Sequence, residues 1–356
     1  MMSLLEVRDL SVQFDTDSGT VHAVDGVSFD VDRGETVCIV GESGSGKTVT
    51  SESITKLVRE PPGSVSADRV SFEDEDLLSL PKKRLREIRG GRIGHVFQNP
   101  QGSLNPVYTV GRQIREAIRL HEDVSKQDAR ERAVDLLHRV GIPKAGERFD
   151  DYPHEFSGGQ KQRIVIAMAI AASPDLLIAD EPTTALDVTI QAQILRLLRD
   201  LQDEYGMAML LITHDLGVVA EVADRVVVMY AGKVMETGDV FEVFENPSHP
   251  YTQALLECLP GRRGGAEGIS GSLPDAKSPP AGCRFADRCQ HAVDACRTGD
   301  QPSMVPVGDE SDTHRASCVY YQAGYDADTV RQSPATGASD DAGSDGEART
   351  DGGASR

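Results

Sequence analysis

The sequence is poor in several residue types that mark particular classes of protein. It has no tryptophan, only nine lysines, and 37 basic against 57 acidic residues, for a net charge of −20. Proteins that bind nucleic acid non-specifically need a cationic surface, so the acidity argues against that class. No apolar run among the 356 residues is long enough to cross a bilayer, and we expect no membrane-spanning helix.

The scarcity of lysine and the acid excess together resemble proteins from organisms with molar internal salt, where screening weakens self-repulsion. The N-terminus has no basic patch followed by an apolar stretch, so we expect no secretory signal and a cytosolic chain. In that reducing compartment the six cysteines should be thiols or metal ligands rather than disulfides.

Short apolar runs alternate with helical stretches over about the first 258 residues. The runs at 37–40, 176–179 and 209–212 have polar flanks, as strands buried on both faces of a parallel sheet do. This alternation predicts an α/β fold. The predicted units are an α/β domain at 1–258 with a helical insertion at about 100–170, an extension with four cysteines at 259–322, and a disordered acidic tail at 323–356.

The segment 41–48, GESGSGKT, fits G-x-x-x-x-G-K-[ST] between a predicted strand and a predicted helix. Its glycines allow the backbone N–H groups to face one anion, and the following helix adds its positive end. Lys47 supplies a charge for the β- and γ-phosphates of ATP, and the Thr48 hydroxyl coordinates Mg²⁺. The expected phosphate-binding residues are Gly41, Ser43, Gly44, Ser45, Gly46, Lys47 and Thr48.

A second predicted strand ends in two adjacent carboxylates. We expect Asp180 to hold Mg²⁺ through water and Glu181 to polarise the attacking water as a general base. Beside a phosphate loop, this pair indicates an enzyme that hydrolyses a nucleoside triphosphate.

Further motifs resemble, in their order, those of the ATP-binding-cassette ATPases over roughly residues 4–258. The matching residues are Gln98 for the glutamine loop, Ser157, Gly158, Gly159 and Gln160 for the signature sequence, 185–187 for the D-loop, and His214 for the switch histidine. The resemblance implies a P-loop cassette fold and a head-to-tail dimer, with ATP between the phosphate loop of one subunit and the signature sequence of another.

The same resemblance implies roles for three more side chains. Gln98 should contact Mg²⁺ and act in catalysis with Glu181 and His214. The family stacks adenine on an aromatic side chain from an early strand, and Phe14 is the best placed candidate. The alternative is that Phe14 is an ordinary core residue.

Longer stretches narrow the resemblance to the ATPases of oligopeptide and dipeptide importers: 97–106, 152–155, 180–191 and 249–252. This implies a peripheral subunit at the cytoplasmic face of the cell membrane. Its partners would be a second cassette subunit, two transmembrane permeases and, indirectly, an extracytoplasmic solute-binding protein, with no nucleic acid. Nickel importers share these motifs, so the solute stays open. A soluble cassette ATPase of DNA repair or translation is the alternative.

The four cysteines of the extension include no C-x-x-C pair, so their spacing is not that of a zinc finger. The sequence around them resembles the C-terminal extension of the peptide-importer ATPases, which implies a [4Fe–4S] cluster on Cys283, Cys289, Cys296 and Cys318. A segment this small has too little core to fold alone, which favours a ligand. Zinc, unligated cysteines in a small core, and a redox-sensing module are the alternatives.

Overall fold

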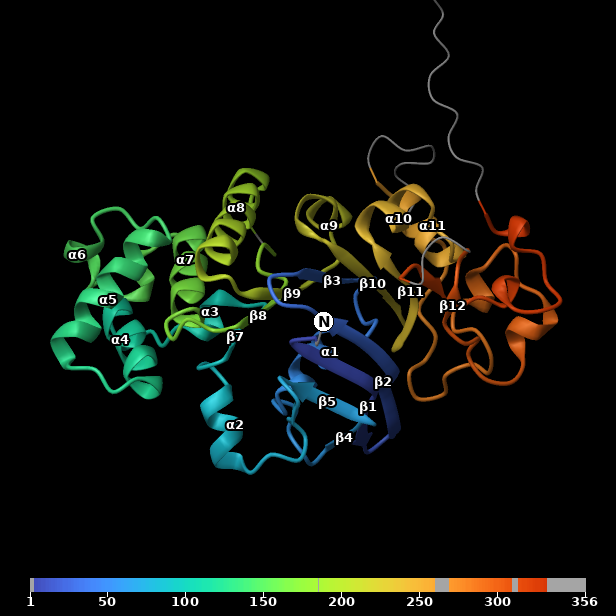
Figure 1. Cartoon of the computed structure of the whole chain (residues 1–356), viewed down its shortest axis with the longest axis horizontal. Coiled ribbons are helices and arrows are strands. Elements are labelled where there is room, and N and C mark those ends of the chain that lie inside the picture. The colour runs from blue at the N-terminus through green and yellow to red at the C-terminus, as the bar shows by residue number, and fades with distance from the viewer. Residues whose placement is uncertain (1–2, 185, 260–268, 309–312, 332–356) are drawn as a thin grey trace, which may run out of the picture.

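The computed structural model describes residues 3–184, 186–259, 269–308 and 313–331. In this part of the chain two sheets lie against each other (Figure 1). The smaller sheet consists of β1 (Leu5–Thr16), β2 (Gly19–Val31), β4 (Gly63–Ser66), β5 (Arg69–Phe72) and β6 (Glu75–Asp76).

The larger sheet has the order β12-β13-β11-β10-β3-β9-β8-β7. Its strands are β3 (Thr36–Val40), β7 (Ile93–Val96), β8 (Leu176–Asp180), β9 (Ala208–Thr213), β10 (Arg225–Tyr230), β11 (Lys233–Asp239), β12 (Val305–Pro306) and β13 (Arg315–Ala316). The strands from β7 to β10 run parallel, as the sequence predicts.

Every residue of β3, β8 and β9 is buried, because this sheet is covered on both faces. Cys38 and Val40 of β3 face one hydrophobic core, which includes the helices. Val37 and Ile39 face the other, which fills the space between the two sheets. The carboxyl ends of these strands are thus held rigidly where the chain turns into the predicted site.

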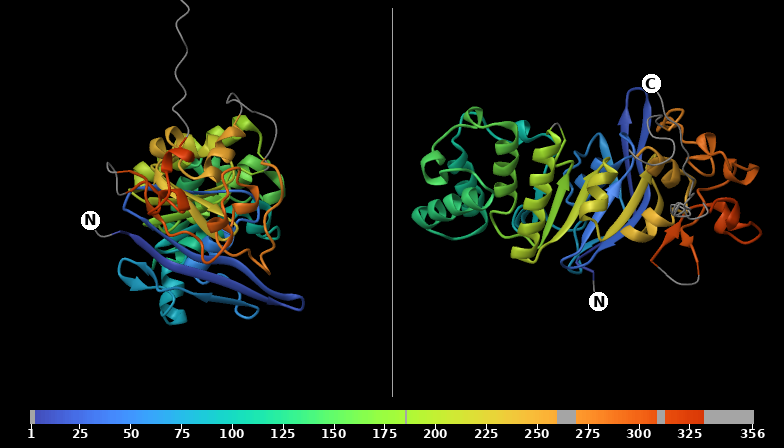
Figure 2. Two further views of the ribbon diagram at one scale, coloured as in Figure 1. Left: turned by 90° about the vertical axis from the view of Figure 1, so that its right-hand side faces the viewer. Right: turned by 90° about the horizontal axis from the view of Figure 1, so that it is seen from above.

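Helices α3 to α7 form a lobe at the left of Figure 1, and α8 to α11 cover the larger sheet. From above, this lobe and the cysteine-bearing extension lie at opposite ends of the molecule (Figure 2). The helices are α1 (Lys47–Ile54), α2 (Lys82–Ile88), α3 (Pro100–Ser103), α4 (Val110–His121), α5 (Lys126–Arg139), α6 (Ala145–Arg148), α7 (Gly158–Ala169), α8 (Val188–Tyr205), α9 (Leu216–Val222), α10 (Val240–Glu245) and α11 (Pro250–Glu257). No helix in the described ranges is long and apolar enough to span a membrane.

The extension continues the larger sheet. Its strand β13 pairs with β11, with Ala316 opposite Glu236. Cys283, Phe285 and Cys296 belong to the same hydrophobic core as the cassette helices. The remainder is short 3₁₀ turns: η1 (Pro153–Glu155) precedes α7, and η2 (Ala286–Arg288), η3 (Asp294–Arg297), η4 (Val319–Tyr321) and η5 (Ala327–Thr329) follow α11. Of the tail predicted to be disordered from 323, the part up to 331 is structured, with η5 and a buried Val330, and 332–356 lies outside the described residues.

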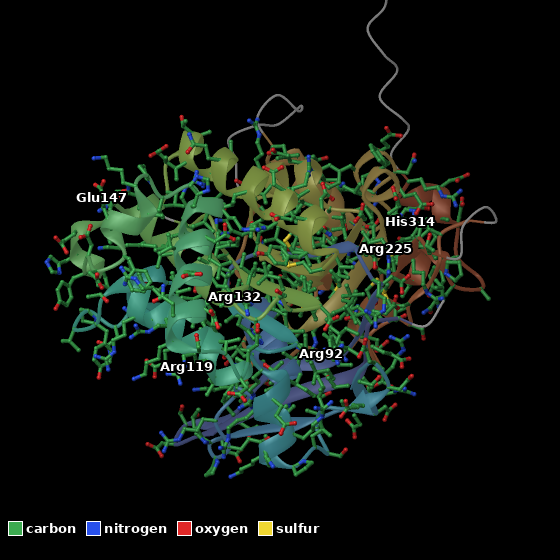
Figure 3. All side chains as sticks on the ribbon, turned by 60° about the vertical axis from the view of Figure 1, so that its left-hand side comes forward. Arg92, Arg119, Arg132, Glu147, Arg225 and His314 are labelled. Atoms are coloured by element: carbon green, nitrogen blue, oxygen red, sulfur yellow. The ribbon has the colours of Figure 1, made fainter. Side chains whose placement is uncertain are left out.

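Charged side chains lie over the surface (Figure 3), and several of them form ion pairs between different elements. Arg92 joins Glu73 and Asp175 at 2.6 and 2.5 Å. Arg225 lies 3.0 Å from the Asp30 carboxylate and 3.2 Å from that of Glu35. Such partly exposed pairs are each worth only about 1 kcal/mol or less, so the two buried cores carry most of the stability.

Candidate functional site

The phosphate loop connects β3 to α1 and requires glycine at its close approaches. Gly46 has φ +99°, and a Cβ there would lie 2.4 Å from the carbonyl oxygen of Ala23. A Cβ on Gly41 would lie 2.0 Å from the carbonyl oxygen of Met229. Since α1 begins directly after Gly46, the loop residues and Thr48 gather at one strand-to-helix turn.

Lys47 is only 5% exposed. Its Nζ donates hydrogen bonds to the carbonyl oxygens of Gly41 and Glu42, at 2.8 and 2.9 Å. Burial lowers the pKa of Lys47, while the charges of Glu181 and Asp180 oppose that shift. The ammonium is therefore held inside the loop and faces the carboxylates at the end of β8.

Asp180 ends β8 with its side chain buried. Its Oδ1 has no hydrogen-bond partner among the described residues, whereas its carboxyl group is hydrogen bonded to Thr48. Burial raises the pKa of Asp180 to about 6. A buried, unpartnered carboxylate oxygen beside a hydroxyl is the donor set that Mg²⁺ prefers, so Thr48 and Asp180 fit a magnesium ion.

Side chains from the segments that follow β7, β8 and β9 meet at Glu181. Its Oε2 accepts hydrogen bonds from Gln98 Nε2 at 2.8 Å and from Thr184 Oγ1 at 2.7 Å. Its Oε1 lies 2.9 Å from His214 Nδ1. Burial alone would raise the pKa of Glu181, but the hydrogen bonds from His214, Thr184 and Gln98 together bring it below its usual value. The structure thus gathers all three predicted catalytic residues on one carboxylate.

The signature residues lie at the start of α7. Ser157 is the N-cap, and its hydroxyl accepts from the Gln160 backbone N–H while the Gln160 side chain accepts from the Ser157 N–H. Ser157 and Gly158 are exposed, and a Cβ on Gly159 would lie 2.8 Å from Ile190. The helix that these residues begin, α7, lies in the lobe of helices, whereas α1, which follows the phosphate loop, lies near the centre of the molecule (Figure 1). The two anion sites are therefore apart within one chain.

Phe14 lies in β1, paired with Val21 of β2 and Gly63 of β4. Its ring is half-buried and packs against the core between the sheets, next to Gly63. This position fits the alternative that Phe14 is a core residue. The adenine contact stays a prediction.

The four extension cysteines come close enough to influence one another, but the structure does not bear out the predicted metal site. Burial raises the pKa of Cys318 to about 12, and the charges of Cys283, Cys289 and Cys296 add to that shift. In the described part of the chain, no three or more His, Cys, Asp or Glu residues are arranged to hold a metal ion. Three of these cysteines, Cys283, Cys296 and Cys318, are buried, and Cys289 is half-buried.

Three residues of this region were not found from the sequence. Thr184 donates a hydrogen bond to Glu181, but the sequence assigns it no role of its own, since it is one residue of the stretch 180–191 that resembles the peptide importers. The hydroxyl of Tyr251 accepts a hydrogen bond from the Glu42 backbone N–H at 2.9 Å. Arg288 contacts the Glu42 carboxylate, and no local pattern marks it.

Comparison with known proteins finds two family matches. The family described as ABC transporter matches residues 24–184, and the family described as oligopeptide/dipeptide transporter, C-terminal region, matches 235–296. The oligopeptide transport ATP-binding protein OppD of Bacillus subtilis is 53% identical over 315 residues, which cover 87% of each chain. The dipeptide transport ATP-binding protein DppD of Escherichia coli is 50% identical over 322 residues, covering 90% of this chain and 97% of the relative.

Solved structures show the same fold. A dimeric bacterial ABC transporter cassette, MJ0796, gives a TM-score of 0.60 at 28% identity and covers 66% of this chain and 98% of its own. CbiO1 of Clostridium perfringens, part of an ABC transporter complex, gives 0.59 at 30% identity and covers 68% and 91%. These matches confirm the predicted P-loop cassette fold.

Proposed function

The chain belongs to the ATP-binding-cassette ATPases of the oligopeptide and dipeptide importers, and we propose that it hydrolyses ATP at Glu181 to drive uptake of short peptides through separate permease subunits. The observation that carries this proposal is the meeting of Gln98, Thr184 and His214 on Glu181, beside the Lys47 loop.

In this proposal Glu181 is the general base. Its three hydrogen bonds keep the carboxylate ionised and oriented at neutral pH. One of the donors, Gln98, is also the residue expected to contact Mg²⁺. If Gln98 turned from Glu181 to the metal, burial would act on the pKa of Glu181 with less opposition, and the carboxylate would become a stronger base.

Thr48 and Asp180 would hold Mg²⁺, which when bound neutralises phosphate charge. Lys47 adds a second positive charge from within the loop. Because 41–48 and 157–160 lie apart within one chain, a complete ATP site requires Ser157 and its neighbours from a second cassette subunit. The relative MJ0796 is solved as a dimer, which supports this arrangement.

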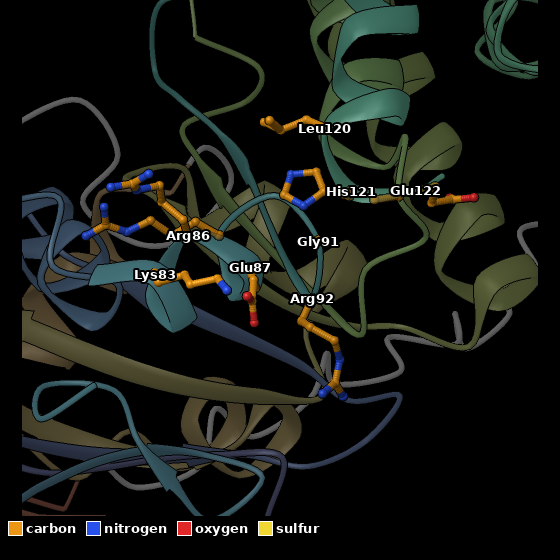
Figure 4. Close-up of a pocket in the computed structure, with 10 residues that line it drawn as sticks. Lys83, Arg86, Glu87, Gly91, Arg92, Leu120, His121 and Glu122 are labelled. Atoms are coloured by element: carbon orange, nitrogen blue, oxygen red, sulfur yellow. The ribbon is translucent and has the colours of Figure 1, made fainter. Parts of the chain in front are cut away.

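We place the permease dock at a cavity of about 620 Å³ between α2 and α4. Leu120 and His121 lie across it from Arg86 and Glu87 (Figure 4). Leu120, near the C-terminal end of α4, is 76% exposed and lines this cavity. An apolar side chain beside cationic groups suits a short amphipathic segment of a membrane subunit.

Cross-linking tests this dock. In the assembled transporter, Leu120→Cys should form a cross-link to a permease. Phe241→Cys, on α10 and 71% exposed, is the matched control that should not. Equal cross-linking by both variants would contradict the location.

We also propose that the four cysteines hold an iron–sulfur cluster, because their thiols lie close enough for the charges of three to affect the pKa of the fourth. Its presence requires the cysteines to rearrange into a ligand set. Anaerobic purification followed by iron and acid-labile sulfide analysis tests it, with Cys289→Ser as the variant that should lose both. Protein without iron, and with a protease-resistant extension, would show that the cysteines are packing residues.

We also infer that the chain is adapted to high salt, on the basis of its −20 charge and few lysines. Thermal melting at low and molar salt tests this, because self-repulsion is least screened at low ionic strength. A melting temperature independent of salt would contradict it.

The function itself is tested by reconstitution. Glu181→Gln should keep ATP binding and lose both hydrolysis and ATP-driven peptide uptake, since an amide cannot accept the proton of water. Glu131→Gln, on the exposed face of α5, should keep both. Uptake of nickel instead of peptide by the wild-type transporter would identify the other solute class.

A further inference from the structure

The cysteine-bearing extension reaches the phosphate loop through one arginine. Arg288 lies at the end of η2, directly before Cys289, and its side chain is 7% exposed. Its Nη1 and Nη2 donate to the two carboxylate oxygens of Glu42, at 2.8 and 2.9 Å. Glu42 is the second residue of the phosphate loop. This two-bonded, largely desolvated pair is the strong form of an arginine–carboxylate contact.

The same guanidinium holds a second segment of the extension. Nε donates to the carbonyl oxygen of Ser270 at 2.8 Å, and Nη2 to that of Ile269 at 2.9 Å. Nη1 also donates to the Tyr230 hydroxyl at the end of β10, at 3.0 Å. Arg288 is therefore fixed by β10 and by the extension at once, and its position is set independently of the phosphate loop.

The segment after residue 269 runs along the nucleotide-binding edge. Leu273 would lie 3.7 Å from a Cβ on Gly44, within the phosphate loop. The carbonyl oxygen of Ala276 accepts from the backbone N–H of His22, and Lys277 donates to the Ser18 hydroxyl. The extension is thus packed against both the phosphate loop and the hairpin of β1 and β2.

Glu42 places a negative charge in a loop that binds an anion, and Arg288 neutralises that charge. A loop that binds phosphates presents N–H groups and the Lys47 ammonium to an anion. A carboxylate within that loop repels the same anion. Its backbone is held by the Tyr251 hydroxyl and by Lys47, so the side chain has little freedom to move away. Arg288 neutralises the charge of the Glu42 carboxylate where the extension contacts the loop.

We propose that Arg288 is a positioning residue for ATP: it neutralises Glu42 and fixes the phosphate loop, so that the cysteine-bearing extension sets the ATP affinity of the chain. The proposal rests on the ATPase function given above. It assigns to the extension an effect on nucleotide binding, independent of any metal.

The test compares two charge-removing variants of the full-length chain. Arg288→Gln leaves an unpaired carboxylate in the loop, so the Kd for a fluorescent ATP analogue and the KM for ATP should rise about tenfold, with kcat within about twofold. Glu42→Gln removes that carboxylate and still accepts from Arg288, so it should weaken ATP binding clearly less than Arg288→Gln does. Arg297→Gln, which breaks an exposed pair with Asp287 in the same extension, is the control that should change neither the Kd nor the KM.

A combined variant separates charge from packing. Arg288→Gln with Glu42→Gln should recover most of the affinity lost by Arg288→Gln alone, because no carboxylate is left unpaired. The effect of Arg288→Gln should also shrink at high salt, as screening of the carboxylate increases. A purely structural role would move neither of these readouts.

Three results would overturn the inference: unchanged ATP affinity in folded Arg288→Gln, equal weakening by Glu42→Gln and Arg288→Gln, or loss of kcat without a rise in KM. If Arg288→Gln fails to fold, Glu42→Gln decides, because a tenfold weaker Kd in that variant would contradict the charge argument. Wild-type protein that binds ATP but does not hydrolyse it in the assembled transporter would instead count against the proposed function.

Discussion

Replacing Asp180 by asparagine should stabilise the folded chain while removing its Mg²⁺-dependent activity. The carboxyl group is buried, and its Oδ1 lacks a partner in the described structure. Burial raises its pKa to about 6; Glu181 adds to the shift, and hydrogen bonding to Thr48 opposes it. At pH 7 the folded chain therefore holds an ionised carboxylate, and burying that charge lowers the free energy of unfolding relative to a neutral side chain at this position.

The size of the effect follows from linkage between protonation and folding. The unfolded chain loses this proton near pH 3.8 and the folded chain near pH 6. Asp180 thus favours folding fully below pH 3.8, and that contribution is lost as the pH rises to about 6. A shift of about two pKa units corresponds to about 3 kcal/mol at pH 7, and to roughly half of that at pH 5. Asp180→Asn should recover up to these amounts.

Urea unfolding of the metal-free, nucleotide-free chain at pH 7 and pH 5 measures both values. Asp203→Asn, on the exposed face of α8, is the matched control and should change little. Mg²⁺ should support hydrolysis by wild type and not by Asp180→Asn. A variant that is no more stable than wild type at pH 7, or that gains equally at both pH values, would refute the reasoning.

Three further outcomes are expected. Thr184→Val should lower kcat a few-fold with KM unchanged, because Glu181 loses one orienting hydrogen bond; steady-state kinetics that show only a higher KM would contradict this. Ser157→Arg should leave ATP binding to the isolated chain intact and abolish hydrolysis in the complex, and persisting hydrolysis there would show that this signature serves no working site. Glu236→Ala should lower the free energy of unfolding by about 3 kcal/mol or more in a urea titration, since the buried carboxylate accepts from two backbone N–H groups and lies 2.8 Å from His314. An unfolding midpoint equal to that of wild type would contradict that role.

The site residues that the sequence predicts are those that belong to short contiguous motifs. The phosphate loop, the Asp180–Glu181 pair and His214 each stand at the end of a largely apolar strand, so both the residue type and its position in the fold can be predicted from the sequence. Parallel strands bring those ends to one edge. The gathering of Gln98 and His214 on Glu181 therefore agrees with what the motifs and the sheet imply.

The sequence was less informative where contacts are distant. The extension was predicted from its cysteines and its composition, which carry no information about where it packs. Its pairing with β11 depends on two residues of β13, too few to give a strand pattern. For Phe14, an aromatic residue in an early strand cannot be distinguished by sequence from a core residue, because both positions require the same side chain.

Arg288 and Glu42 show why coupling between segments is harder to predict than chemistry. The two residues are 246 positions apart, and each alone has an ordinary explanation: an arginine beside a cysteine, and an acidic residue in a variable position of a phosphate loop. Their joint role is visible only in the contact itself. There the Glu42 carboxylate, which alone would repel ATP, is neutralised and links the phosphate loop to the extension. Since Arg288 is held by Tyr230 and the 269–270 carbonyls as well, the attachment is rigid on the extension side. A displacement of η2 would thus affect the phosphate loop in two ways. It would leave the charge of Glu42 unpaired, and it would shift the Glu42 backbone, whose carbonyl oxygen accepts a hydrogen bond from Lys47.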